Sequence, residues 1–137
     1  LILRKTIDGI DASKGYPTFT FKITQTKDEN GNALTYTNEY IRTISFDSSD
    51  TEPTKEITVS NLPIGTYIVQ ELSALGYIQS GLTVEGDSRA IITETNAAVS
   101  LASEDPVTVA FSNRLNEETP PGYVAFADNK ISYPAQE

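Results

Sequence analysis

The sequence predicts an all-β fold, a two-sheet sandwich of the immunoglobulin-like type. Short β-prone segments recur along the chain and are separated by Gly, Pro, Asn and Asp, a pattern typical of such sandwiches. Several of these segments alternate apolar and polar residues with period two, as a half-buried strand does. No segment has the periodicity of an amphipathic helix. Strands alone are therefore expected.

The composition limits the chemistry available to the chain. It has 137 residues, enough for one domain with a core, and a net charge of -9, which argues against nucleic acid or an anionic membrane as partner. Cys and His are absent, so disulfides, Ser-His-Asp triads and Cys-His triads are excluded. We predict no cofactor and no metal site.

The expected strands divide the chain into a domain and a tail. They are Leu1–Ile7, Thr18–Thr26, Thr35–Phe46, Glu56–Val59, Thr66–Leu72, Gly76–Val84, Ala90–Thr95 and Val107–Leu115. Asn30-Gly31 predicts a tight turn between the second and third strands. Residues 1–115 are thus the predicted domain. Residues 116–137 are a Pro-containing linker and tail, expected to add a strand or to begin a neighbouring module.

The start of the chain indicates a fragment of a longer protein. The first residues lack the plan of a signal peptide, and no apolar run is long enough to cross a bilayer. The first residue already lies inside an expected strand. We therefore expect the chain to be cut from a larger protein, without its leader or anchor.

Three polar residues interrupt the apolar faces of three expected strands. They are Lys5, Glu71 and Asn113, and their neighbours on the same faces are Leu1, Leu3 and Ile7, then Tyr67 and Val69, then Val109, Phe111 and Leu115. Each could instead lie near a strand end, where a polar side chain reaches water. Together they predict an amine, a carboxyl and a carboxamide that converge inside the sandwich.

Four segments resemble a known family when they are taken in order. They are Leu1–Gly9, Phe19–Ile23, Leu62–Tyr67 leading to Glu71, and Val109–Asn113. This set is similar to the isopeptide-linkage domain of Gram-positive, streptococcal-type pilins, which is related to the B-type domains of collagen adhesins (Cna). The resemblance covers about residues 1 to 115. It implies an amide bond between Lys5 and Asn113, promoted by Glu71 as the catalytic acid.

The implied reaction agrees with elementary chemistry. A neutral Lys5 amine attacks the carboxamide carbon of Asn113 and expels ammonia, while a protonated Glu71 polarises the carboxamide oxygen and passes protons to the leaving group. Folding holds the groups together, and oriented intramolecular reactions reach effective molarities on the order of 10⁵ M. Bond formation occurs once per molecule and without turnover, so we do not expect the protein to be an enzyme.

The resemblance also implies a place and a role. The chain is expected to be a structural module of an extracellular, cell wall-anchored pilus or adhesin, hardened by the crosslink against force and proteases. Its implied partners are neighbouring pilin or adhesin modules and, for attachment, host extracellular matrix or glycans. It is not expected to bind nucleic acid or to enter a membrane.

Two alternatives remain open from the residues alone. The loop Asp28-x-Asn30-x-Asn32 with Glu39 imitates a calcium loop, although Ala33 stands where the required glycine belongs. A second possibility is an uncrosslinked sandwich that binds glycan or host protein through exposed tyrosines. Its candidate residues are Tyr36, Tyr40, Tyr67 and Tyr77.

Overall fold

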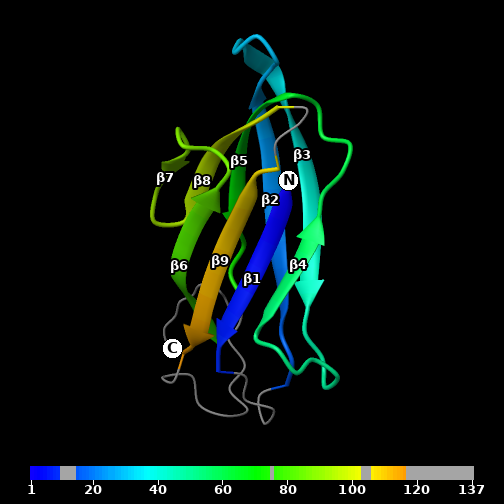
Figure 1. Cartoon of the computed structure of the whole chain (residues 1–137), viewed down its shortest axis with the longest axis vertical. Coiled ribbons are helices and arrows are strands. Elements are labelled where there is room, and N and C mark those ends of the chain that lie inside the picture. Colours follow the sequence, from blue (N-terminus) through cyan, green and yellow to red (C-terminus); the bar gives the residue numbers. More distant parts are fainter. Residues whose placement is uncertain (10–14, 75, 103–105, 117–137) are drawn as a thin grey trace, which may run out of the picture.

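The computed structural model describes residues 1–9, 15–74, 76–102 and 106–116, and within them nine strands form two packed sheets (Figure 1). The strands are β1 (Ile2–Asp8), β2 (Thr18–Lys27), β3 (Ala33–Ser45), β4 (Thr54–Thr58), β5 (Gly65–Glu71), β6 (Tyr77–Glu85), β7 (Ile91–Ile92), β8 (Asn96–Leu101) and β9 (Thr108–Leu115). The predicted all-β sandwich of immunoglobulin-like type is confirmed. No helix in the described ranges has the length and apolarity to cross a bilayer.

The strand order brings the first and last strands side by side. One sheet has the order β4-β1-β9-β6 and the other β3-β2-β5-β8-β7. The β1–β9 pair is parallel, whereas the other pairs are antiparallel. Strand β5 lies in the middle of the second sheet, in the opposite layer. Figure 1 shows these two layers, with the β2–β3 hairpin extending beyond them at one end.

Alternating side chains from both sheets fill the space between the layers. In β1, β2, β5 and β9, every second residue is buried, because successive side chains of a strand point to opposite faces. The core residues include Leu3, Ile7, Phe19, Phe21, Ile23, Tyr67, Val69, Val109 and Phe111. The inward faces predicted for these four strands are confirmed.

The prediction for the segment between β6 and β9 was wrong in part. The expected strand Ala90–Thr95 is reduced to the two residues of β7. A strand that was not predicted, β8, follows at Asn96–Leu101 and pairs with β5. It alternates as the others do, but two of its six residues are alanines, which have low β-propensity. Packing against β5 outweighs that weak local preference.

The β2–β3 connection is a turn stabilised by the side chain of Asp28. Asp28 Oδ1 accepts hydrogen bonds from the N–H groups of Asn30 and Asn32 at 2.9 Å each, and Gly31 has a φ of 80°. Glu39 lies in β3 opposite Thr24 instead of turning toward this loop. The geometry is that of the predicted turn and gives no support to the calcium interpretation.

The tail at 117–137, where a linker or added strand was predicted, lies outside the described residues.

Candidate functional site

The three polar residues singled out in the sequence all point into the core. Lys5 is 0% exposed in the middle of β1, Asn113 is 2% exposed in β9, and Glu71 is 9% exposed at the end of β5. Lys5 and Asn113 therefore come from neighbouring strands of one sheet, and Glu71 from the facing sheet. Their predicted burial is confirmed.

The register of the parallel pair places Lys5 and Asn113 within reach of each other. Lys5 pairs with Phe111, and Ile7 pairs with Asn113. Lys5 and Asn113 are therefore offset by two residues, so that both side chains lie on the same inner face. Diagonal neighbours at such an offset are within reach of a long side chain.

Glu71 meets Lys5 from the opposite layer. Lys5 Nζ and Glu71 Oε2 are 2.5 Å apart, and both side chains are almost fully buried. Their angles do not meet hydrogen-bond geometry, however, so neither atom has an aligned hydrogen-bond partner. The two atoms are thus in contact, but they do not form an aligned, hydrogen-bonded ion pair.

Asn113 also contains an unsatisfied polar atom. Among the described residues, Asn113 Oδ1 is buried without a hydrogen-bond partner, as are Lys5 Nζ and Glu71 Oε2. A buried polar atom left unpaired costs about 1–3 kcal/mol, and more when it is charged. Such groups are rare in native proteins, and a chemical role is one recognised reason for them.

The environment makes Lys5 a better nucleophile than an ordinary lysine. Burial lowers the pKa of Lys5 from 10.5 to about 8, although contact with Glu71 opposes the change. Burial has this effect because a low-dielectric core disfavours the charged form. At neutral pH about one Lys5 in ten is then neutral, roughly 300 times the fraction expected for an unperturbed lysine.

Two neighbours of Lys5 were not anticipated from the sequence. Lys5 Nζ lies 4.2 Å from the centroid of the Phe19 ring. On the other side of β1, Lys55 of β4 pairs directly with Lys5. The alternation placed Phe19 on an inward face, but contacts between sheets depend on how the layers stack, and no local pattern reports that.

The four tyrosines proposed as a sugar-binding face do not form a surface. Tyr67 is 0% exposed, and its hydroxyl donates to Pro63 O at 2.5 Å. Tyr77 packs edge-on against Phe19, and Tyr40 packs against the core. Only Tyr36 among them is largely exposed, at 86%. These four tyrosines therefore do not share one exposed face, and glycan binding stays an untested alternative.

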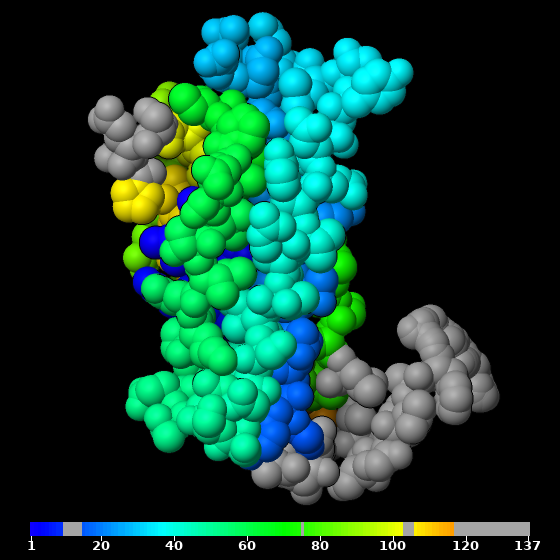
Figure 2. All heavy atoms as spheres, turned by 90° about the vertical axis from the view of Figure 1, so that its right-hand side faces the viewer, coloured from blue at the N-terminus to red at the C-terminus, as the bar shows by residue number. Residues whose placement is uncertain are grey.

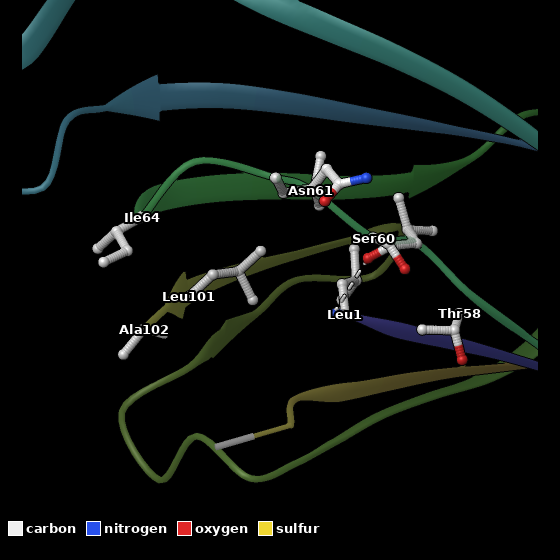
Figure 3. Close-up of a pocket in the computed structure, with 9 residues that line it drawn as sticks. Leu1, Thr58, Ser60, Asn61, Ile64, Leu101 and Ala102 are labelled. Atoms are coloured by element: carbon white, nitrogen blue, oxygen red, sulfur yellow. Dashed lines mark hydrogen bonds between the residues drawn. The ribbon is translucent and has the colours of Figure 1, made fainter. Parts of the chain in front are cut away.

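A surface hollow of about 460 Å³ lies away from the three polar residues. Its lining comes from the start of β1, the segment between β4 and β5, and the end of β8 (Figure 3). Asn113 and Glu71, by contrast, lie where β9 and β5 end. The hollow has no charged side chain in its lining, which includes Leu1, Thr58, Ser60, Asn61, Ile64 and Leu101. The hollow is therefore separate from the buried cluster.

No family model, curated protein or solved structure matches the chain. Functional inference therefore depends on the buried cluster itself.

Proposed function

We propose that this chain is a structural domain that forms an intramolecular amide bond between Lys5 and Asn113, with Glu71 promoting the reaction. The observation that carries the proposal is a set of three buried and unsatisfied polar atoms between the sheets: Lys5 Nζ is in contact with Glu71 Oε2, and Asn113 Oδ1 lies two residues away in the register of β1 and β9. Bond formation removes the buried amine and leaves an amide N–H and C=O. These groups can exchange hydrogen bonds with a protonated Glu71, so one reaction satisfies all three atoms.

The reaction balances within the cluster. Lys5 gives a proton to Glu71, and the contact between Nζ and Oε2 is short enough for that transfer. The neutral Nζ then attacks Cγ of Asn113, and protonated Glu71 supports the developing negative charge on Oδ1. Nζ then gives up a second proton to Nδ2, and the Cγ–Nδ2 bond breaks while Glu71 keeps the first proton. The products are one secondary amide and one ammonia, and no external reagent is needed.

The position of the bond suits a load-bearing module. Strands β1 and β9 are parallel neighbours, so the start of β1 and the end of β9 lie at opposite ends of the pair. A bond between Lys5 and Asn113 carries tension from one strand directly to the other, and the strands between them in sequence are bypassed. Such a domain fits the shaft of an extracellular, cell wall-anchored pilus or adhesin, with neighbouring modules as its partners.

The first test is the intact mass of the purified chain. We expect a deficit of one ammonia, followed by digestion that yields a single branched peptide containing Lys5 and Asn113. Glu71→Ala should fold without the deficit. If the parent chain has the full mass of its sequence, the proposed bond does not form. If Glu71→Ala shows the same deficit as the parent, Glu71 does not promote the reaction.

Two controls make the mass test specific. Asn96→Ala removes another asparagine whose Oδ1 is buried without a hydrogen-bond partner, but its strand partner Gln70 is on the opposite face from Glu71. This variant should keep the deficit. The turn at Asn30-Gly31 could also lose ammonia by forming a succinimide, so Asn30→Ser should likewise keep it. Loss of the deficit in either control would assign the lost ammonia to that asparagine and not to Asn113.

A further inference from the structure

The Lys5 amine rests on the face of an aromatic ring. Its Nζ is 4.2 Å from the centroid of Phe19, which comes from β2 in the facing sheet. Both residues are 0% exposed. A cation at this distance from a ring face is attracted by the ring quadrupole, most strongly where water is excluded. The contact therefore acts on the charge and the position of the same amine that the proposed reaction uses.

Two other rings fix the orientation of Phe19. Phe46 lies edge-on at 6.1 Å between centroids with an interplanar angle of 88°, and Tyr77 lies at 5.5 Å with an angle of 75°. Edge-to-face pairs of this kind are favourable and directional. Because Phe19 is held by rings from two other segments, it offers the amine a fixed platform.

The row of rings is anchored at the rim of the sandwich. Lys55 Nζ lies 5.5 Å from the Phe46 centroid, donates to Ser45 O at 2.7 Å and is 3.2 Å from Asp50 Oδ1. These contacts tie β4 to the end of β3 across the two sheets. Figure 2 shows these two edge strands side by side on this face of the molecule. The contacts of Lys55 with β3 and Asp50 thus hold Phe46 in place, and Phe46 in turn holds Phe19 beside Lys5.

We propose that Phe19 is a positioning residue for the crosslinking reaction: its ring holds the Lys5 amine against Glu71 and favours the charged form of that amine. The reaction part of this inference depends on the proposed function, whereas the contact with Lys5 does not. Burial and the ring then act in opposite directions. Burial drives Lys5 toward the neutral nucleophile, and Phe19 limits that change while keeping the amine in place.

Few charged groups face Lys5, so the effect of the ring can be isolated. Glu71 approaches from β5, Lys55 is the partner of Lys5 in β4 and is itself paired with Asp50, and β6 contributes the Tyr77 phenol beside Phe19. The buried residues of β2 and β9 near Lys5 are not titratable. A change confined to the Phe19 ring leaves these groups where they are.

The decisive experiment changes the charge distribution of the Phe19 ring and keeps its shape nearly the same. In an Asn113→Ala background, which cannot crosslink, Phe19 is replaced by trifluorophenylalanine. The pKa of Lys5 is then measured by NMR titration of its ¹³Cε signal. Fluorination removes the negative ring face, so we expect the pKa of Lys5 to fall by roughly half a unit to one and a half units.

Phe21 provides the matched control for this experiment. It is equally buried on the same face of β2, but its ring packs on Phe111 at 5.2 Å. Phe21 is the strand partner of Glu71, so the same fluorination there should shift the pKa of Lys5, but by clearly less than the fluorination of Phe19. The pair Phe19→Leu and Phe21→Leu repeats the comparison with natural residues. An unchanged pKa in both Phe19 variants, or equal shifts from both positions, overturns the proposal.

The reaction itself gives a second readout. Chains collected unfolded and unreacted are folded in acid, where Lys5 is charged, and then moved to a series of higher pH values. The rate of ammonia loss is followed by mass. With fluorinated Phe19 we expect the midpoint of the pH–rate profile to move to lower pH, and the plateau rate to fall because the amine is less well held.

The outcomes separate the two proposals. If the parent chain loses no ammonia at any pH, the proposed function fails, while the Lys5 titration still decides whether Phe19 holds the amine. If the parent reacts and the fluorinated chain has the same midpoint and the same plateau, the role of Phe19 in the reaction is wrong and the crosslink stands.

Discussion

Arg4 and Lys5 are consecutive residues of β1, both are cationic and both contact glutamates, yet they lie in opposite environments. Arg4 points outward, with its Nε 2.6 Å from Glu56 Oε2 and its Nη1 3.3 Å from Glu85 Oε2. Lys5 points inward to Glu71 at 2.5 Å. The side chain of Arg4 is 32% exposed, whereas that of Lys5 is 0% exposed. Strand alternation alone makes this difference.

The difference shows how solvent decides what an ion pair can do. Around Arg4, water screens the charges and satisfies the remaining polar atoms, so the pairs contribute little to stability. The Lys5 side chain is shielded from bulk solvent, so its charge is costly to keep. On the proposed function, the inner pair removes this buried charge when Lys5 bonds to Asn113. At the exposed Arg4 position, hydration of the charge removes any comparable driving force for such a reaction.

The largest expected effect is the loss of the crosslink. Asn113→Ala should abolish the ammonia deficit and lower the free energy of unfolding by about 4–5 kcal/mol, because the closed loop of roughly a hundred residues no longer restricts the unfolded chain. Thermal and urea unfolding measure the difference. Asn96→Ala is the control and should unfold close to the parent. Equal unfolding of the Asn113→Ala variant and the parent would contradict the crosslink.

Removing Glu71 should have the next largest effect. In the Asn113→Ala background, Glu71→Gln leaves the buried Lys5 without its carboxylate, and breaking a buried pair in this way costs about 3–5 kcal/mol. Part of that cost is relieved when Lys5 loses its proton. Urea midpoints measure the change.

A third substitution tests the cause of that loss. Adding Lys5→Met to the Glu71→Gln variant removes the unpaired charge, so most of the lost stability should return. No recovery would mean that packing around Glu71, and not the charge of Lys5, explains the loss.

The inward faces of the sandwich were predictable because alternation is a local property. Lys5, Glu71 and Asn113 stand out as polar residues in otherwise apolar rows, and the structure buries all three. The strand β8 was not predicted, because its two alanines weaken the local preference and its stability comes from β5. The contact with β5 therefore forms this strand where the local sequence preference is weak.

Contacts across the core could not be predicted in the same way. The proximity of Phe19 to Lys5 depends on how the two sheets stack, and the pairing of Lys5 with Lys55 depends on the register of β1 and β4. Period-two alternation predicts which face of its sheet a residue occupies, but it does not predict which residue of the facing sheet or the neighbouring strand it contacts. The buried cluster was thus predictable in its members, and its surroundings were not.

The inner pair should also make stability depend on pH. The pKa of Lys5 is lowered from 10.5 to about 8 in the folded chain, so between these values the unfolded chain binds more protons. Stability of the Asn113→Ala variant should therefore rise as the pH increases from about 8 to 10.5, by on the order of 3 kcal/mol in total. Urea midpoints across this range measure the slope.

The control for the pH experiment removes the titrating group. Adding Lys5→Met to the Asn113→Ala variant should flatten the rise, since the remaining lysines and tyrosines are unchanged. Burial raises the pKa of Tyr67 to about 12, so Tyr67 works against the rise only near pH 10 and above, where the unfolded chain loses that proton first, and it does so equally in both variants. A rise that persists without Lys5 would assign the pH dependence to another group.

The smallest expected effect belongs to the outer pair and completes the comparison. Glu56→Gln removes the closer partner of Arg4, but Glu85 remains and water reaches the guanidinium. The urea midpoint should shift by little more than the error of the measurement, and added salt should erase the difference. The ammonia deficit should stay complete, because the outer face takes no part in the reaction. A loss of stability as large as that of Glu71→Gln would show that exposure does not separate the two pairs, and burial would then no longer explain the reactivity that we propose for Lys5.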